Sequence, residues 1–281
     1  MIDNNELTSC IAENITAALN EDLSTGDITA QLIPEHMQAC ATVTTRQSAV
    51  LCGTAWFDAC FSAMDKNYSV RWLSKDGDIV EPNQILCEVH GNARALLTAE
   101  RCALNFLQTL SATATQTRCY VDAVRGTHVK IMDTRKTLPG LRAAQKYAVS
   151  IGGGHNQRIG LFDGVLIKEN HILAMGGIRP ALEFAFGCAP KGMSVQIEVE
   201  DIAQLHEAIE AGATLVLLDN FNLEDLHSAV NLTAKRAQLE ASGGITVDTV
   251  RAVAETGVDR ISIGKITKDL QAIDLSMRFK T

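Results

Sequence analysis

From residue 129 onward, short apolar runs alternate with segments whose apolar residues recur at helical spacing. Helical segments such as 202–211 and 247–255 lie between most of the runs. Strands that alternate with helices indicate parallel β-α units. Six units favour an incomplete, open α/β barrel of about six parallel strands over a small flat sheet. The runs cover residues 129–132, 165–167, 195–199, 215–218, 238–241 and 260–263.

Each apolar run ends on a polar, charged or glycine position. In α/β barrels the active site lies where the strands end, at their carboxyl-terminal face. An ordinary strand-end loop would explain one such residue, but six in register predict that these side chains meet at one site. They are Asp133, Lys168, Glu198 to Glu200, Asp219, Ser242-Gly243-Gly244 and Gly264.

The first part of the chain follows a different pattern. Strand-like runs at 41–45, 69–73 and 85–89 surround a helical segment at 54–64, and a long helix is expected to open at Thr98. Strands joined by turns around a packed helix predict an α+β sandwich. We therefore expect a mixed α/β chain with a sandwich domain at 1–115 and a barrel domain at 116–268. The segment 269–281 is expected to pack back on the sandwich.

Charge and cysteine content restrict the partners. The formal net charge is −8, so nucleic acid and anionic membranes are not expected as partners, and an anion would need a local basic pocket. The eight cysteines form no C-x-x-C pair, which predicts free thiols in a reducing, cytoplasmic compartment and argues against zinc. The polar start of the chain and the absence of a long apolar run predict no signal peptide and no membrane span.

Basic residues gather between Asp133 and Lys168. Arg135 and Lys136 follow a predicted strand, where a planar guanidinium suits a carboxylate and an ammonium suits a phosphate. This segment alone is equally compatible with a solvated turn that carries surface ion pairs. A run of three glycines at 152–154 precedes Arg158 and is compatible with either a ligand loop or a merely flexible one. Lys168 is expected to point into the barrel mouth.

Acidic residues follow the next two strands. Glu198 and Glu200 are two residues apart, hence on one face of a strand, and Asp219 ends the following strand. Carboxylates of this kind suit Mg²⁺ that also binds substrate phosphates. Each could instead pair with a neighbouring lysine. The sequence leaves open whether Glu198 or Glu200 faces the site.

Glycine loops end the last two strands. Ser242-Gly243-Gly244 and Ile263-Gly264-Lys265 lie where α/β barrels bind phosphate at helix N-termini. The ligand is therefore expected to be a polyanion that contains phosphate and carries Mg²⁺, with no redox cofactor. Acyl transfer is disfavoured because no Ser-His-Asp or Cys-His arrangement is evident.

At these residues the chain resembles the quinolinate phosphoribosyltransferase family over nearly its full length. Glu100 to Asn105, Asp133 to Leu141, Gly152 to Gly160, Leu166 to His171 and Leu217 to Asn220 carry much of the resemblance. Further matching stretches are 21–29, 197–200, 240–245 and 272–279. The resemblance implies a decarboxylating pentosyltransferase of NAD biosynthesis, which joins quinolinate to phosphoribosyl pyrophosphate and releases nicotinate mononucleotide, CO₂ and pyrophosphate.

The resemblance also implies roles for individual residues and a homodimer with shared active sites. Arg101 would reach the neighbouring subunit's site. Glu198 and Asp219 would lie near the ribose hydroxyls and Mg²⁺, and together with Lys136 and Lys168 they are the expected catalytic residues. Quinolinate and the phosphates would be bound by Thr134, Arg135, Lys136, Arg158 and Lys168. The 5′-phosphate would lie against Ser242, Gly243, Gly244, Ile263, Gly264 and Lys265.

Two departures from the family pattern stand out. Gln157 occupies the position of a usual histidine before Arg158, while His155 lies two residues earlier, and Lys265 replaces a common alanine. Three other interpretations compete. A paralogous phosphoribosyltransferase of molybdenum-transport operons is disfavoured by the segment 168–171. A non-catalytic phosphoribosyl-binding sensor predicts the loss of a charged site residue. An unrelated barrel aldolase or epimerase would leave Arg101 and Arg135 without a role.

Overall fold

The computed structural model describes residues 4–280. Their contacts divide the chain into two compact units, each formed by more than one segment. The first unit comprises the described parts of 1–118, 137–153 and 266–281, and the second comprises 119–136 and 154–265. The expected domain boundaries at 115/116 and 268/269 stay predictions.

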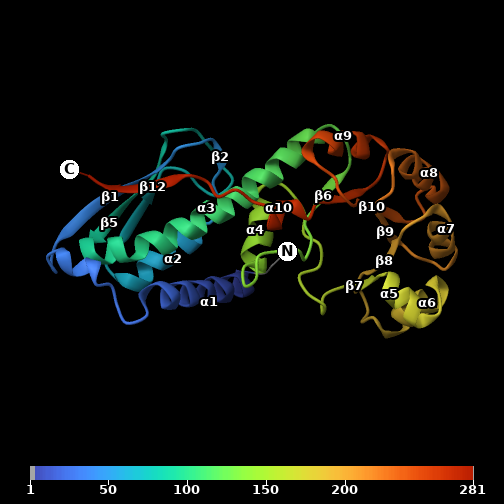
Figure 1. The fold of residues 1–281 in the computed structure, drawn as a ribbon, viewed down its shortest axis with the longest axis horizontal. Helices are drawn as coiled ribbons and strands as arrows, with labels where there is room; N and C mark the ends of the chain where they lie inside the picture. The colour runs from blue at the N-terminus through green and yellow to red at the C-terminus, as the bar shows by residue number, and fades with distance from the viewer. Residues whose placement is uncertain (1–3, 281) are drawn as a thin grey trace. The chain divides into compact units, whose positions relative to one another are not determined.

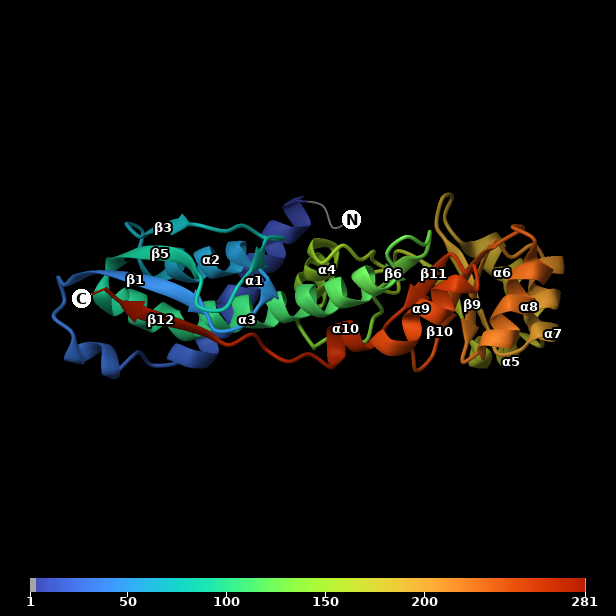
Figure 2. The same ribbon diagram turned by 90° about the horizontal axis from the view of Figure 1, so that it is seen from above.

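The first unit is built on a four-stranded antiparallel sheet in the order β12-β1-β5-β3. Its strands are β1 (Gln38–Thr45), β3 (Ser69–Trp72), β5 (Ile85–Asn92) and β12 (Leu275–Phe279). The C-terminal strand β12 pairs with β1 along Ala41 to Thr45. A separate two-stranded pair joins β2 (Ala49–Val50) to β4 (Ile79–Val80), which the sequence patterns did not indicate. Figures 1 and 2 show the helices of this unit gathered beside the sheet.

These helices supply most of the first core. They are α1 (Asn4–Leu23), α2 (Thr54–Met64), α3 (Ala93–Ala123) and the short 3-10 helix η1 (Thr29–Leu32). In α2, Trp56, Phe57 and Phe61 are buried, and the Phe57 ring lies 5.2 Å from that of Trp72 on β3. Alternate residues of β1 are buried, as expected of a strand with one face on a core.

Helix α3 begins five residues before the expected start at Thr98. The structure explains the difference through Asn92, the last residue of β5. Its Oδ1 accepts hydrogen bonds from the backbone N–H groups of Arg94 (3.0 Å) and Ala95 (3.3 Å). This cap satisfies donors that the first helical turn leaves open. The strand therefore passes directly into the helix.

Helix α4 (Arg142–Ile151) belongs to the first unit, although it follows the first strand of the parallel sheet. Two of its side chains account for this. Gln145 Nε2 donates to the backbone oxygen of Thr267 at 2.7 Å, and the Tyr147 hydroxyl donates to Asp76 Oδ2 at 2.8 Å. The contacts join segments far apart in sequence, so local patterns could not indicate them.

The second unit is built on six parallel strands in the order β6-β11-β10-β9-β8-β7. Because β6 pairs with β11, the strands β6 and β7 are the two ends of an open sheet. This confirms the expected incomplete α/β barrel of six parallel strands and the mixed α/β class. The strands are β6 (Lys130–Met132), β7 (Val165–Ile167), β8 (Val195–Val199), β9 (Leu215–Asp219), β10 (Gln238–Ser242) and β11 (Arg260–Ser262).

Helices follow most of these strands and form one continuous layer (Figures 1 and 2). Neighbouring helices from α5 to α9 pack on one another, α7 also packs on β8, and α9 packs on β11. They are α5 (Glu169–Met175), α6 (Ile178–Cys188), α7 (Ile202–Glu210), α8 (Leu223–Thr233) and α9 (Val247–Glu255). The short helix α10 (Lys265–Lys268) follows β11, and its residues from Ile266 onward belong to the first unit. Within residues 4–280, no helix combines the length and apolarity that crossing a membrane requires.

A carboxyl in the first unit makes stability depend on pH. Asp58 on α2 accepts from Trp72 Nε1 at 3.0 Å, and burial, aided by the charge of Asp76, raises its pKa from 3.8 to about 6. Because the folded state then binds more protons than the unfolded chain, stability falls as pH rises from 3.8 to about 6. We expect Asp58→Asn to remove this part of the pH dependence and to stabilise the protein above pH 6.

Urea unfolding of both proteins between pH 4 and pH 7 measures the difference in slope. Equal slopes for the wild type and Asp58→Asn would show that Asp58 titrates normally.

Candidate functional site

A cavity of about 420 Å³ opens where the strands of the parallel sheet end. All six strands, or the residues directly after them, contribute to it. This is the edge at which α/β folds bind ligands. Its lining comprises Thr134, Arg135, Lys136, Gln157, Arg158, Leu166, Lys168, Glu198, Leu217, Asp219, Glu240, Ser242 and Ser262.

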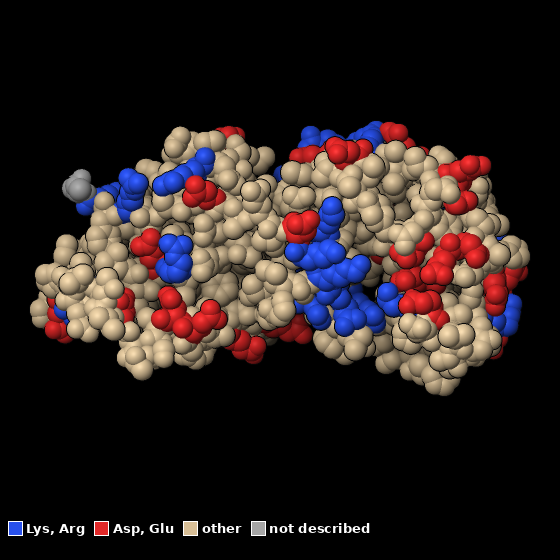
Figure 3. Space-filling view, in the orientation of Figure 1, with Lys and Arg blue, Asp and Glu red and all other residues tan. Residues whose placement is uncertain are grey.

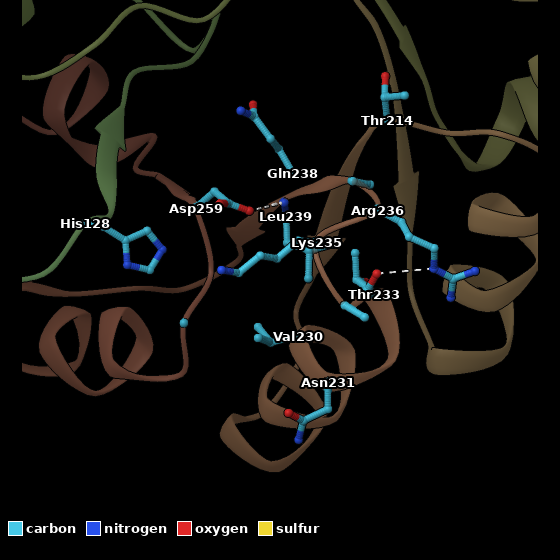
Figure 4. A pocket seen from close by; sticks show the side chains of 13 residues that line it. His128, Thr214, Val230, Asn231, Thr233, Lys235, Arg236, Gln238, Leu239 and Asp259 are labelled. Atoms are coloured by element: carbon cyan, nitrogen blue, oxygen red, sulfur yellow. Dashed lines mark hydrogen bonds between the residues drawn. The ribbon is translucent and has the colours of Figure 1, made fainter.

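A larger cavity of about 710 Å³ lies at the opposite edge, where the strands begin. Figure 4 shows His128, Lys235 and Asp259 around it. Its polar groups are largely used within the fold. Asp259 Oδ2 accepts from the backbone N–H of Leu239 at 2.8 Å, and Arg236 binds Glu210 at 2.9 Å. These bonds hold neighbouring parts of the second unit together and leave few polar groups for a ligand. The cavity at the carboxyl ends of the strands is therefore the candidate site.

Two arginines lie close together in the candidate site. Arg158 is half-buried, and its pKa is lowered by burial and then by the charge of Arg135. Its Nη1 donates to the backbone oxygen of Gly164 at 2.8 Å. The Nε of Arg135 is buried and has no hydrogen-bond partner among the described residues. Two guanidinium groups that interact within one cavity favour an anion that binds both, above all a carboxylate.

Lys168 and Glu198 form an ion pair across the strands β7 and β8. Lys168 Nζ lies 3.1 Å from Glu198 Oε2. The backbone N–H of Lys168, the N-cap of α5, donates to Nδ1 of His171 in the first turn of that helix at 3.0 Å. The Glu198 side chain is 13% exposed and that of Lys168 is 46% exposed. The lysine is therefore the partner that a phosphate arriving from solvent would reach.

Asp219 lies at the end of β9 and lines the same cavity. Its Oδ2 accepts from Asn220 Nδ2 at 2.8 Å. The Asn220 backbone N–H donates to the oxygen of Ser242 at 2.9 Å, which ties the ends of β9 and β10 together. Asp219 and Glu198 thus provide two carboxylates on neighbouring strands.

The glycine loop after β10 approaches Asn220 closely. Gly243 has φ +107°, and a Cβ there would lie 2.1 Å from Asn220 Oδ1. After β11, a Cβ on Gly264 would meet Lys136 Cδ at 3.2 Å, so the Lys136 side chain lies over this second glycine loop. Backbone without side chains beside a lysine is the arrangement that phosphate groups require.

Charges of opposite sign are separated around the site. Figure 3 shows Lys and Arg side chains gathered in one area and Asp and Glu side chains in another, with a hollow between. The cavity itself takes Arg135, Lys136, Arg158 and Lys168 from the loops and strands nearest β6 and β7, and Glu198 and Asp219 from β8 and β9. A local basic pocket therefore exists in a chain of net charge −8.

The structure gathers most, though not all, of the residues expected at the site. Arg101 lies on α3 in the first unit, where it lines a groove with Glu21 and Asp22. Glu198 lines the cavity, whereas Glu200 lies beyond the end of β8 and outside the cavity lining. The backbone N–H of Glu200 donates to Gln204 Oε1. Lys265 is exposed at the start of α10, outside the cavity lining.

The sequence patterns missed two polar side chains within strands. Glu240 lies in the middle of β10, Gln196 is the second residue of β8, and both are buried. Glu240 also lines the cavity. A carboxylate inside an apolar run was the available signal, because a buried acid is costly and needs a partner.

No group of three or more His, Cys, Asp and Glu residues in the described chain is arranged to hold a metal ion. A pair of carboxylates still fits Mg²⁺, which keeps several waters and takes further oxygens from substrate phosphates. Glu198 and Asp219 are that pair, beside the lysines and glycine loops suited to phosphate.

Comparison with known families accounts for both units. Residues 27–111 match the model of the quinolinate phosphoribosyl transferase N-terminal domain. Residues 113–278 match the model of the C-terminal domain of the same family.

Individual relatives agree with the family models. A probable nicotinate-nucleotide pyrophosphorylase (carboxylating) of Bacillus subtilis is 41% identical over 92% of this chain and 89% of its own. The nicotinate-nucleotide pyrophosphorylase (carboxylating) of Mycobacterium leprae is 39% identical over 94% and 95% of the two chains. The solved nicotinate-nucleotide pyrophosphorylase of Francisella tularensis superposes with a TM-score of 0.94, at 44% identity over 97% of this chain and 96% of that one.

The close approach of Gly243 to Asn220 predicts a local loss of stability. Gly243→Ala would combine left-handed strain, about 1–2 kcal/mol, with a steric overlap costing roughly 1–3 kcal/mol. Gly212→Ala is the matched control, because Gly212 has a similar φ of +90° with open space around it. Urea unfolding should show a larger loss for Gly243→Ala, whereas equal losses would contradict the overlap.

Proposed function

Because this chain belongs to the quinolinate phosphoribosyl transferase family, we propose that it transfers the phosphoribosyl group of phosphoribosyl pyrophosphate to quinolinate. The products are nicotinate mononucleotide, pyrophosphate and CO₂. The observation that carries this proposal is the juxtaposition of Arg135 and Arg158 with the Lys168–Glu198 pair in one cavity. A dicarboxylate and a polyphosphate can bind there side by side.

The arginines bind the dicarboxylate. Arg135 offers a buried Nε without a partner in the described chain, and Arg158 lies close enough for the two charges to interact. Two guanidinium groups hold two carboxylates in fixed directions and so orient the pyridine ring. Thr134, beside Arg135 in the cavity lining, adds a hydroxyl to this side of the site.

The lysines and glycine loops bind the phosphates. Lys136 lies over Gly264, and Lys168 is the exposed member of its ion pair. Pyrophosphate oxygens compete with Glu198 for Lys168. The 5′-phosphate fits the backbone of the loops at 242–244 and 263–265, which precede α9 and begin α10.

The transfer proceeds by displacement at C1 of the ribose. The pyridine nitrogen donates its lone pair to C1, the C1–O bond breaks, and pyrophosphate leaves with the bonding electrons. Glu198 and Asp219 face the positive charge that develops on the ribose and stabilise it. The C2–carboxylate bond then breaks to release CO₂, its electron pair stays on C2 beside the pyridinium nitrogen, and C2 takes up a proton. No protein nucleophile is needed.

Mg²⁺ fits the same carboxylates. Glu198 and Asp219 would hold it together with phosphate oxygens, and when bound it neutralises the leaving pyrophosphate. The ammonium groups of Lys136 and Lys168 also help to neutralise the negative charge of the pyrophosphate.

We propose a homodimer with shared active sites. Arg101 lies in the first unit and lines a groove there rather than the cavity. In a dimer this arginine completes the dicarboxylate site of the neighbouring subunit, as the resemblance to the family implies. We further propose a cytoplasmic location, which the eight free cysteines support. The net charge of −8 argues against nucleic acid or anionic membranes as partners.

An activity assay tests the reaction. The purified protein with quinolinate, phosphoribosyl pyrophosphate and Mg²⁺ should form nicotinate mononucleotide, and chelation of the metal should abolish this. Lys136→Ala and Lys168→Ala should each lower kcat/KM roughly 10²–10³-fold, because each removes a charge that faces the leaving group. Lys235→Ala, in the cavity at the opposite edge, is the matched control and should retain activity. Product from nicotinate but not from quinolinate would overturn the proposal.

Subunit mixing tests the shared site. Arg101→Ala and Lys136→Ala should each be inactive alone, but exchange of subunits should restore about one quarter of wild-type activity, since half of randomly formed dimers are mixed and each has one intact site. The control mixture of Lys136→Ala with Lys168→Ala should stay inactive, because both defects lie in the same cavity. If only background activity appears in the first mixture, Arg101 does not serve the partner.

A further inference from the structure

Glu240 is a fully buried carboxyl in the floor of the cavity. It lies in the middle of β10, opposite Leu217 on β9 and Arg260 on β11, and its exposed fraction is 0%. The proposed mechanism gives it no contact with the reacting atoms. Burial of an acid is costly unless hydrogen bonds compensate for the lost water, so its partners are informative.

Two neutral amides contact this carboxyl. Gln157 Nε2 donates to Glu240 Oε1, and Gln196 Nε2 donates to Glu240 Oε2 at 3.1 Å. Gln157 Nε2 also lies 3.5 Å from Gln196 Oε1. Burial raises the pKa of the Glu240 carboxyl, although the side chains of Gln196, Ser262 and Gln157 and the charge of Arg260 oppose this. An apolar side chain of similar volume would fill the same space at lower cost.

Gln157 is held from two sides. Its backbone N–H donates to Asp133 Oδ1 at 2.8 Å, and its side chain is held by Glu240. Asp133 is itself buried and also accepts from Asn156 Nδ2 at 2.7 Å. Apart from an isolated bridge at His155, the segment 154–164 contains neither helix nor strand. Backbone hydrogen bonds of His155 with Ile131 and Asp133 fix the start of this segment, and side-chain contacts hold the residues that follow.

Arg158 follows Gln157 directly, lines the same cavity as Arg135 and lies close enough for the two charges to interact. The two like charges repel each other. Other contacts must therefore hold the segment 154–164 in place if both arginines are to bind the same ligand. We infer that Glu240 is a positioning residue, which holds Gln157 and thereby keeps Arg158 in place for the dicarboxylate. This inference rests on the proposed function. It also explains what Gln157, the departure from the family pattern, contacts.

Three methionine variants of the full-length protein test the inference. Glu240→Met removes the acceptor, Gln157→Met removes the donor, and Gln196→Met is the matched control, because it removes the other amide but leaves the Glu240–Gln157 contact. Glu240→Met and Gln157→Met should each weaken the binding of quinolinate about tenfold, as the loss of one buried hydrogen bond implies. The KM for phosphoribosyl pyrophosphate should stay nearly unchanged in both variants. Gln196→Met should bind quinolinate nearly as the wild type does.

A double-mutant cycle separates positioning from a general structural role. If Glu240 acts through Gln157, the double variant Glu240→Met/Gln157→Met should bind quinolinate no more weakly than either single variant. Additive losses would overturn the inference, and so would wild-type affinity in Glu240→Met or an equal loss in Gln196→Met. Calorimetric titration of quinolinate and steady-state KM values provide both readouts.

Glu240→Gln replaces Glu240→Met in the cycle if the latter fails to fold. Gln157 and Gln196 donate to different oxygens of the carboxylate. The side chain of Glu240→Gln offers an oxygen in only one of these places and an NH₂ group in the other, so quinolinate binding should again weaken while the protein stays folded. The wild-type titration distinguishes the two proposals. If the wild type does not bind quinolinate, the proposed function fails. If the wild type binds it and the Glu240 variants bind it equally well, only the positioning role fails.

Discussion

Parallel pairing of β6, β11, β10, β9, β8 and β7 is the constraint on which the site depends. Because all six strands run in one direction, their carboxyl ends meet at one edge, and residues more than a hundred positions apart become neighbours. Lys136 lies over Gly264 for this reason. At this edge, Lys and Arg side chains, carboxylates and glycine loops come together. No single segment of the chain could provide all of them.

Buried acidic residues of the second unit hold the segment that carries Arg158. Asp133, directly after β6, and Glu240, within β10, are buried acids, and both contact Gln157. A loop without regular structure is thereby fixed at two points, and Arg158 follows at once. The repulsion between Arg158 and Arg135 is tolerated because these contacts resist it.

Much of this could be predicted from local patterns. The six apolar runs correspond to the six strands within one or two residues at each end, because buried parallel strands are continuously apolar. Other features depended on contacts between distant segments. The early start of α3 follows from the cap at Asn92, and the place of α4 follows from the bonds of Gln145 and Tyr147. No periodicity records such contacts.

The sequence by itself determined the alternation of strands and helices, the six parallel strands, and the charged and glycine residues at their ends. These follow from the period of the apolar residues and from the rule that parallel strands end at one edge. Only the tertiary structure decided that Glu198 rather than Glu200 lines the cavity and that Arg101 lines a groove of the first unit. It also decided that Glu240 contacts Gln157. The physical reason is that side-chain direction and long-range hydrogen bonds are set by packing between strands, which one-dimensional spacing does not contain.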